Sequence, residues 1–140
     1  MNTDPDCIFC KIVAGAIPSL KLLETDKILS FMDINPFNDG HCLVIPKAHS
    51  ENLFAAGDED LAACIKAVKT VATAVEHALA PDGINIMQAN GAAAGQSVFH
   101  YHMHVFPRGA NDSATFNWGY KPGDMDRLKE IQAKILAAMP

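Results

Sequence analysis

The sequence predicts an α+β fold in which an antiparallel meander of strands carries helices on one side. Three features support this prediction: short apolar stretches separated by turn residues, one long segment with helical periodicity, and a stretch in which histidines alternate with apolar residues. The chain has 140 residues, which is enough for one domain with a modest core. Because it shows no repeats, linkers or low-complexity segments, we expect residues 1–140 to form a single domain.

The first third of the chain predicts a hairpin followed by a buried strand. Residues 14–18 break the chain after a short start that is either helical or looped. Two apolar stretches, 20–23 and 28–32, are separated by four polar residues and indicate a hairpin. Turn-forming residues follow at 35–40, and the apolar stretch 41–45 indicates a strand that a proline ends.

A long helix is expected over residues 58–79. Its apolar residues recur at steps of three and four, which places them in one stripe. This stripe consists of Leu61, Ile65, Val68, Ala72, Val75 and Leu79. Asp58 is the expected N-cap, and the acidic residues after it favour the positive end of the helix dipole.

The remaining elements are shorter. Residues 81–83, Pro-Asp-Gly, end the long helix, and a strand is expected over 84–88. A loop of small residues at 90–95 precedes the strand that contains the histidines. A closing helix is expected over 124–139, and the apolar residues expected to face inward are Leu128, Ile131 and Ile135.

Three of the six histidines, His100, His102 and His104, occupy every second position. Because successive side chains of a strand point to opposite faces, these three share one face. The other face, toward the core, is expected to carry Phe99, Tyr101, Met103 and Val105. Clustered imidazoles are costly to bury without partners, and imidazole suits proton transfer, nucleophilic attack and metal binding. This row of histidines is therefore our candidate for the functional centre.

Taken by itself, the row leaves three interpretations open. In the first, the imidazoles bind one zinc ion, as in a hydrolytic metal site. In the second, one imidazole is a nucleophile, and its neighbours position and protonate the substrate. In the third, the row is an ordinary histidine-rich strand or an expression tag. Its interior position and the apolar residues between the histidines argue against a tag.

Composition and charge argue against several classes of function. No apolar stretch approaches the roughly 20 residues of a membrane span, and the acidic, polar N-terminus does not resemble a secretory signal. The four cysteines are therefore expected to be thiols or metal ligands in the reducing cytoplasm. The net charge is −5 and the 11 lysines and arginines are scattered, which disfavours nucleic-acid binding. A bound phosphate must then be held by imidazoles, hydroxyls and backbone N–H groups.

Three separated blocks of the sequence resemble the histidine-triad (HIT) family. The row matches the family signature, H-x-H-x-H-x-x with apolar x, at 100–106, and residues 95–99 also fit. The other matching blocks are 31–36 with 40–49, and the opening 7–12. The resemblance is nearest to the Hint-like nucleoside phosphoramidate hydrolases in their bacterial form. It implies an antiparallel sheet with one long and one C-terminal helix. It also implies a two-fold dimer, paired through the long helix and a strand into one continuous sheet.

The resemblance also assigns catalytic roles. It implies that Nε2 of His102 attacks the α-phosphorus of a nucleotide, and that water then hydrolyses the nucleotidyl-histidine intermediate. His104 and Ser97 are expected to hold the phosphoryl oxygens. The proton for the leaving group could come from His104, from a serine or from water. His41 is expected beside the triad, where it orients a catalytic imidazole.

A second group of residues matches family positions that contact the nucleotide. Asp33 is implied to accept hydrogen bonds from the ribose hydroxyls, and Asn90 and Gln96 to contact the nucleotide. The residues implied to enclose the base are Ile8, Phe9, Ile12, Phe31 and Ile34. Without the resemblance these apolar residues would be read as ordinary core. Trp118 is a candidate for the leaving-group side of the pocket.

Cys7 and Cys10 have the C-x-x-C spacing of a zinc site, but one such pair supplies half of the ligands. In relatives with this pair, the other two ligands match His49 and His100 here. The resemblance therefore implies one structural zinc ion held by these four residues. Two buried thiols are the alternative.

These interpretations combine into one expected function. The chain is expected to be a cytoplasmic, homodimeric hydrolase of a P–N or phosphoanhydride bond at the α-phosphate of a purine nucleotide, such as a phosphoramidate or a dinucleoside polyphosphate. No organic cofactor, nucleic-acid polymer or membrane partner is expected. Two alternatives remain: a zinc-dependent hydrolase that uses the three histidines as ligands, and a nucleotide-binding regulatory protein without catalysis.

Overall fold

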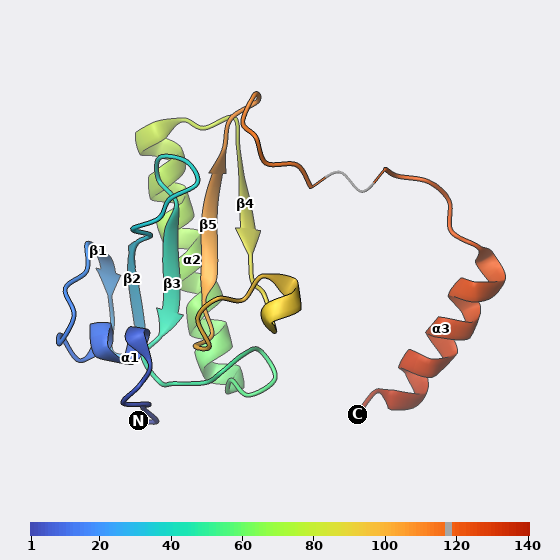
Figure 1. Ribbon diagram of the computed structural model, residues 1–140, viewed down its shortest axis with the longest axis horizontal. Coiled ribbons are helices and arrows are strands. Elements are labelled where there is room, and N and C mark those ends of the chain that lie inside the picture. Colours follow the sequence, from blue (N-terminus) through green and yellow to red (C-terminus); the bar gives the residue numbers. More distant parts are fainter. Residues whose placement is uncertain (117–118) are drawn as a thin grey trace.

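The fold is built on a five-stranded antiparallel sheet (Figure 1). A computed structural model describes residues 1–116 and 119–140. The strands are β1 (Lys21–Glu24), β2 (Ile28–Met32), β3 (Cys42–Pro46), β4 (Gly83–Met87) and β5 (Met103–Arg108). The helices are α1 (Ile8–Val13), α2 (Asp58–Leu79), α3 (Met125–Ala138) and the short 3-10 helix Ala92–Ala94. The expected α+β class, with its antiparallel sheet and its long and C-terminal helices, is confirmed.

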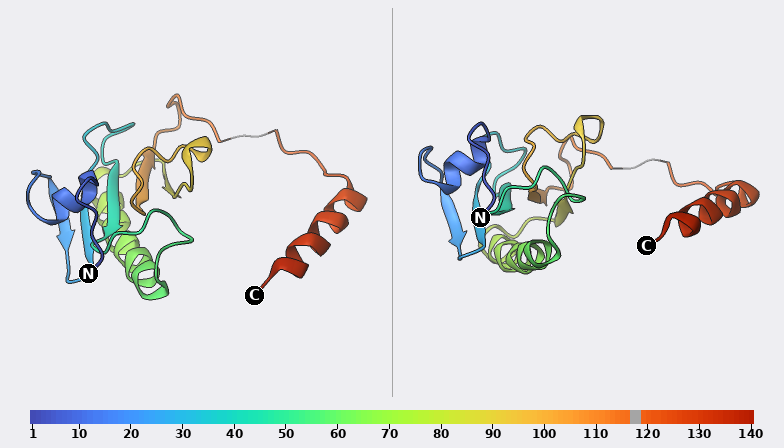
Figure 2. Two further views of the ribbon diagram at one scale, coloured as in Figure 1. Left: turned by 60° about the horizontal axis from the view of Figure 1, so that its bottom comes forward. Right: turned by 90° about the horizontal axis from the view of Figure 1, so that it is seen from below.

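The arrangement of the sheet differs from a simple meander. The strand order is β1-β2-β3-β5-β4, because β5 returns between β3 and β4. The two faces of the sheet are covered by different helices (Figure 2): α2 packs against one face and α1 against the other. The expectation of helices on one side is therefore wrong, since the short N-terminal helix covers the face opposite α2.

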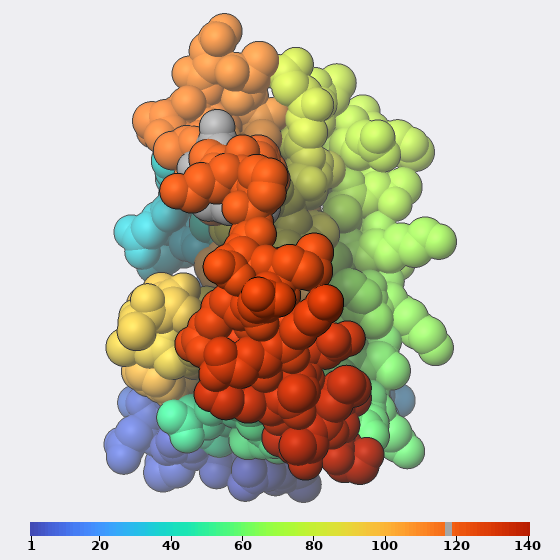
Figure 3. All heavy atoms as spheres, turned by 90° about the vertical axis from the view of Figure 1, so that its right-hand side faces the viewer, coloured from blue at the N-terminus to red at the C-terminus, as the bar shows by residue number. Residues whose placement is uncertain are grey.

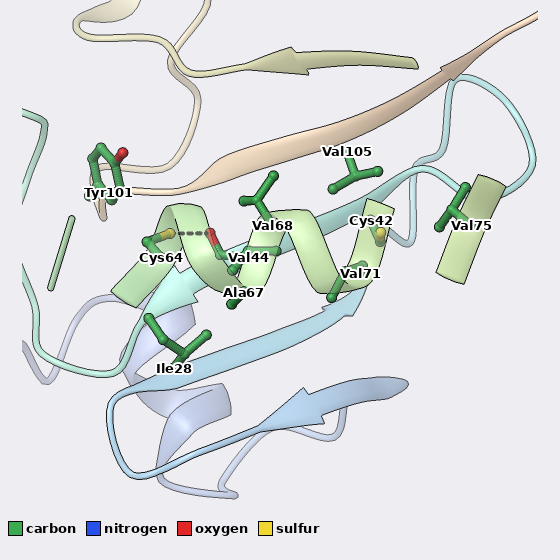
Figure 4. Close-up of a cluster of buried hydrophobic side chains, with 10 residues drawn as sticks. All are labelled: Ile28, Cys42, Val44, Cys64, Ala67, Val68, Val71, Val75, Tyr101 and Val105. Carbon is green, nitrogen blue, oxygen red and sulfur yellow. Dashed lines mark hydrogen bonds between the residues drawn. The ribbon is translucent and has the colours of Figure 1, made fainter. Parts of the chain in front are cut away.

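β3 is apolar throughout because both of its faces are buried. Cys42 and Val44 face α2 in the larger core cluster (Figure 4), where the Cys64 thiol donates to the carbonyl oxygen of Val44 at 3.5 Å. Leu43 faces the opposite way, into the smaller cluster beneath α1. Leu43 pairs with His104 of β5, and the two-residue period of a strand places both on the α1 face.

α2 has a recognisable start and end. Gly57, not Asp58, is the N-cap, and Ala80 ends the helix with a left-handed φ of 44°. The buried face consists of Cys64, Ala67, Val68, Val71 and Val75. The expected stripe is partly wrong, because the sheet contacts a neighbouring row of the helix and leaves Ile65 and Leu79 49% and 50% exposed. Among the described residues, no helix combines the length and the apolarity that crossing a membrane requires.

The histidine row enters the sheet later than the alternation predicts. β5 begins at Met103, so His100 and His102 lie in the segment that leads into the strand. Tyr101 is buried against α2, as expected. Phe99 is 45% exposed, and its expected place in the core is wrong. The alternation weakens before Met103 because the regular pairing of β5 with β3 extends to that residue.

α3 stands clear of the sheet (Figures 1 and 2). The Asp124 carboxylate caps its first turn by accepting from the backbone N–H of Arg127 at 2.9 Å. None of its residues, all of them described, is buried, and Leu128 and Ile135 are 53% and 57% exposed. The expected inward orientation of Leu128, Ile131 and Ile135 is therefore wrong within one chain.

A glycine in the turn before β3 allows a close approach to α2. Gly40 has a φ of +88°, and a Cβ built there would lie 2.6 Å from Cδ1 of Leu79. We predict that Gly40→Ala lowers the free energy of unfolding by about 2–4 kcal/mol, through left-handed backbone strain and steric overlap. Gly15→Ala is the matched control, because φ there is +77° with no neighbour within 4 Å, and it should cost about 1 kcal/mol. Equal losses in chemical denaturation would contradict the steric argument.

Candidate active site

A pocket of about 380 Å³ opens on the α1 face of the sheet. Its walls come from α1, from the end of β2 and the residues after it, and from the segment that leads into β5. The predicted site residues that line it are Ile8, Phe9, Ile12, Phe31, Asp33, Ile34, Ser97, His102 and His104. One cavity thus contains residues from three distant parts of the sequence.

Phe9 connects the apolar wall of the pocket to the triad. Its ring packs edge-on against Phe31, with 5.5 Å between centroids, and against His102 at 5.3 Å. Phe9 belongs to α1, whose N-cap is Cys7. The Cys7 Sγ accepts from the backbone N–H of Cys10 at 3.4 Å. The helix that supplies this wall of the pocket is therefore anchored at the cysteine pair.

His102 is held with Nε2 unprotonated. Its Nδ1 lies 2.6 Å from the backbone carbonyl oxygen of His100. A carbonyl oxygen can only accept a hydrogen bond, so Nδ1 carries the proton. Burial lowers the pKa of His102, and the ring is therefore neutral near pH 7, with its lone pair on Nε2. A neutral imidazole with a free Nε2 in a pocket wall is suited to nucleophilic attack.

His104 has the opposite protonation pattern, and His41 sets it. The backbone N–H of Phe37 donates to Nδ1 of His41 at 3.1 Å. Burial lowers the pKa of His41, so this ring is neutral and its proton is on Nε2. That Nε2 donates to Nδ1 of His104 at 2.8 Å. The proton of His104 is therefore on its own Nε2, in a ring whose centroid is 5.0 Å from that of His102.

Asp33 supplies the carboxylate of the pocket, whose described lining contains no lysine or arginine. One oxygen accepts from the backbone N–H of Asn35 at 2.8 Å, and the other lies 3.4 Å from Nε2 of His41. Asp33, His41 and His104 also lie close enough together to hold a metal ion, but the hydrogen bond between the two rings uses the nitrogens that an ion would need. A bound phosphate would depend on neutral donors, as the charge pattern predicts.

Two predicted nucleotide contacts, Asn90 and Gln96, lie outside the lining of this pocket. Gln96 is buried, and its Oε1 accepts from the backbone N–H of Gly91 at 2.8 Å. Asn90 accepts from the backbone N–H of Leu53 at 2.9 Å. Both side chains therefore hold the loop that carries Ser97, and their contact with a nucleotide remains a prediction.

Beside the triad, Cys7, Cys10, His49 and His100 converge on one point, with all four ligand atoms within 4.8 Å of one another. The Nδ1 atoms of the two histidines are 3.3 Å apart. The Cys7 Sγ lies 3.5 Å from Nδ1 of His100, and the Cys10 Sγ lies 3.5 Å from Nδ1 of His49. Ligands of a tetrahedral zinc ion stand about 3.3–3.8 Å apart, given metal–ligand bonds of about 2.0–2.3 Å. The donor set therefore fits a closed tetrahedral site.

His100 is turned away from the pocket toward this cluster. Its Nε2–H donates to the carbonyl oxygen of Pro46 at 2.8 Å, which leaves the lone pair of Nδ1 directed at the other ligands. Burial lowers the pKa of His100 to about 4, so the ring is neutral. Within the described residues, His100, His102 and His104 do not form a group whose ligand atoms gather at one point. This geometry argues against a three-histidine metal site.

Sequence reasoning missed part of the pocket. Ile17, Pro18 and Val98 also line it, and Ser19 contributes a buried hydroxyl that has no hydrogen-bond partner in the described structure. The role of the Phe37 N–H was missed because a backbone donor in a turn has no side-chain signature. Trp118, the candidate for the leaving-group side, lies outside the described residues.

The environment of His104 makes the folded state sensitive to acid. Burial, together with the nearby His102 and His41, lowers the pKa of His104 from 6.5 to about 4. Because the unfolded chain takes up this proton first, the stabilisation is complete above pH 6.5 and is lost as the pH falls toward 4. We predict that His104→Asn reduces the acid-induced loss of unfolding free energy by about 1–3 kcal/mol. His77→Asn, at an exposed position, is the control and should lose unfolding free energy with falling pH as the wild type does. The same dependence of unfolding free energy on pH in the wild type and both variants would refute this account.

Comparison with known proteins agrees with this geometry. Residues 14–111 match the HIT domain. A crystal structure of a HIT family member from Bacillus subtilis is 40% identical, with a TM-score of 0.90, and the match covers 96% of this chain and 98% of that chain. A Zn-bound histidine triad family protein from Mycobacterium smegmatis is 35% identical, with a TM-score of 0.74 over 96% and 98% of the two chains. Adenosine 5′-monophosphoramidase of Candida albicans is 37% identical over 142 residues, 96% of this chain and 92% of that protein. The chain therefore belongs to the histidine-triad family.

Proposed function

We propose that this protein hydrolyses a P–N or phosphoanhydride bond at the α-phosphate of a purine nucleotide. The observation that carries the proposal is the complementary protonation of two adjacent imidazoles, with a lone pair on Nε2 of His102 and a proton on Nε2 of His104. One ring can attack phosphorus while the other donates to the phosphoryl oxygen on which charge develops. The relative named adenosine 5′-monophosphoramidase supports a nucleoside phosphoramidate as the substrate class.

In the first step, Nε2 of His102 attacks the α-phosphorus, and the new N–P bond forms as the bond to the leaving group breaks. The Nδ1–H of His102 remains bonded to the His100 carbonyl oxygen, which stabilises the positive charge that the ring acquires. Because Nδ1 of His104 already accepts from His41, His104 acts as a hydrogen-bond donor and not as a reservoir of protons. The leaving group takes its proton from water, and the Ser97 hydroxyl in the same lining relays it.

In the second step, the hydroxide left from that water attacks the phosphorus, and the N–P bond to His102 breaks. The nucleoside monophosphate leaves, and His102 returns to its neutral form with a free Nε2. One water molecule is consumed over the two steps: its proton leaves with the first product and its hydroxide with the second. Asp33, in the same lining, binds the ribose diol through its carboxylate in both steps.

We further propose that Cys7, Cys10, His49 and His100 hold one structural zinc ion. The fit of their spacing to tetrahedral ligands supports this, as does the Zn-bound relative. When bound, the ion supplies a cross-link between the N-terminal segment and the triad segment, with no open coordination position for water. Of the four residues, His100 is the one whose carbonyl oxygen orients His102.

We also propose a two-fold dimer formed through α2 and β4. β4 is the end strand of the described sheet, and Ile86 on it is 40% exposed. A second copy paired antiparallel to β4 would continue the sheet and cover this edge. None of the four cysteines is in a disulfide bond, which supports a location in the reducing cytoplasm.

Two alternatives to this hydrolase differ in what they predict. A zinc hydrolase would need the three histidines on one ion, and their separation in the described structure disfavours it. A nucleotide-binding regulator would use the same pocket without chemistry. Turnover of adenosine phosphoramidate and diadenosine polyphosphates by the purified protein separates a hydrolase of either kind from the regulator, and binding without turnover would favour the regulator.

The nucleophile assignment predicts a large kinetic loss and a specific covalent adduct. His102→Ala should reduce turnover of adenosine phosphoramidate by about a thousandfold or more. His102→Asn should still bind the nucleotide, because the pocket wall keeps its shape. Mass spectrometry of reactions quenched in alkaline denaturant, where the N–P bond survives, should find the adenylyl group on the peptide that contains His102. An adduct on any other residue would disprove the assignment.

The ribose role of Asp33 predicts selective weakening. Asp33→Ala removes the carboxylate that would bind the diol, and ribonucleotide affinity should fall about tenfold more than 2′-deoxyribonucleotide affinity. Isothermal titration calorimetry with AMP and 2′-deoxy-AMP measures both. Equal weakening of the two ligands would argue for a purely structural role.

The structural zinc predicts a separation of stability from chemistry. Cys7→Ala and Cys10→Ala should lose the metal and lower the melting temperature, while the rate of the chemical step changes little. Cys64→Ala, a buried thiol outside the cluster, should retain the metal. Metal analysis, calorimetry and single-turnover kinetics check these points. Full zinc occupancy after replacement of both cysteines would contradict the site, and turnover abolished by chelation would favour the zinc hydrolase.

A further inference from the structure

α3 carries an apolar stripe that its own chain leaves uncovered. Leu128, Ile131 and Ile135 recur at steps of three and four on one side of the helix. Away from the stripe, Arg127 and Glu130 form an ion pair at 2.9 Å. A 14-residue helix is marginal in water without tertiary packing, so α3 requires a surface that packs against the stripe.

The position of α3 directs it away from the body of its own chain. The helix lies beyond the β4 side of the sheet, clear of the strands and of α2 (Figures 1 and 2). Viewed from that side, it stands in front of the rest of the molecule (Figure 3). The match to the Bacillus subtilis structure covers 96% of the chain. The unmatched remainder is shorter than the 14 residues of α3, so the match includes most of the helix.

An apolar groove of about 620 Å³ lies near the opposite edge of the sheet. It is formed mainly by β1, the end of β2 and the C-terminal half of α2, and its large apolar residues are Leu22, Leu23, Met32, Val71, Val75 and Leu79. Leu22 and Leu79 are 49% and 50% exposed. Ala74 and Ala78 also line the groove and are exposed, so this part of α2 leaves space for side chains from another helix.

We propose that α3 of one copy docks into this α2–β1 groove of a second copy, and that the exchange is reciprocal. Each copy has one such groove and one uncovered helix. A reciprocal exchange therefore fills both grooves, covers both helices and gives a closed dimer. The groove adjoins β1, whereas the proposed sheet pairing uses β4 at the other edge, so the two contacts do not compete.

Charge also favours this pairing. α3 has three lysines and arginines against two acidic residues, a net charge of +1, which leaves eight against fourteen, a net charge of −6, on the rest of the chain. Asp39 is the charged residue of the groove lining. The resulting attraction brings a basic helix to an acidic body. The inference rests on the proposed dimer and is independent of the catalytic activity.

A photo-cross-link between isotopically distinct copies tests the docking directly. The full chain carries p-benzoylphenylalanine in place of Leu128 and is allowed to exchange subunits with ¹⁵N-labelled wild type. After irradiation, α3 of the unlabelled copy should be attached to peptides from β1 or from the second half of α2 of the labelled copy. The same probe at Ala133, on the opposite side of the helix, should give no such product. Cross-links confined to one copy, cross-links to another surface, or none would overturn the inference.

Point variants of the full chain give an independent measurement. Leu128→Asp on α3 and Ala78→Arg in the groove should each raise the dimer dissociation constant by about tenfold or more, measured by sedimentation over a dilution series. Ala133→Asp and Ala62→Arg, exposed positions on the same two helices outside the contact, should change it by less than about twofold. An unchanged constant for Leu128→Asp and Ala78→Arg would overturn the docking and leave the dimer intact. A monomeric wild type would overturn both.

Discussion

His100 connects the three parts of this molecule on which the proposed chemistry depends. Its Nε2–H is bound to the carbonyl oxygen of Pro46 at the end of β3, and its Nδ1 faces the thiols of Cys7 and Cys10. Its own carbonyl oxygen determines which nitrogen of His102 carries the proton. The residue is 0% exposed. Because buried polar groups are costly without partners, displacing His100 would disturb the sheet, the Cys/His cluster and the orientation of His102 together.

The imidazoles proposed to act on a phosphate are neutral. Burial lowers the pKa of His41, His102 and His104, so none of these rings competes for protons near pH 7. Neutral rings have one protonated and one free nitrogen, and the partner of one nitrogen therefore decides the chemistry of the other. A carbonyl acceptor leaves a lone pair on Nε2 of His102, and a donor leaves a proton on Nε2 of His104. Without these contacts, nothing would distinguish the protonation of His102 from that of His104.

The short helix α1 depends on what surrounds it. It has six residues, too few to be stable by propensity, so its position comes from packing. Phe9 and Ile12 bury themselves in the smaller core cluster, and Cys7 and Cys10 at its start belong to the ligand cluster. The apolar wall of the pocket and the proposed metal are therefore parts of one substructure. α3, at the other end of the chain, also needs packing to be stable, but the described part of its own chain buries none of its residues.

By itself, the sequence determined the strands, the long helix and most of the pocket. The strands and the long helix follow from local signals, because the two-residue period of a strand and the spacing of apolar residues in a helix can be read within one segment. The resemblance to the HIT family, carried by the H-x-H-x-H row and the matching upstream blocks, implied most of the side chains that line the cavity, including Asp33, Ser97, His102 and His104. The C-x-x-C spacing likewise indicated half of a ligand set.

The tertiary structure alone decided how these pieces meet. The insertion of β5 between β3 and β4, the rotation of His100 toward the cysteines and the donation from the Phe37 N–H to His41 have no local signature. The amphipathic pattern of α3 predicted a buried face, but not that the body of the same chain would leave it uncovered. Strand order, ring orientation and the surface that a helix covers all depend on contacts between segments distant in sequence. The pattern of apolar residues within either segment carries no information about the energy of such contacts.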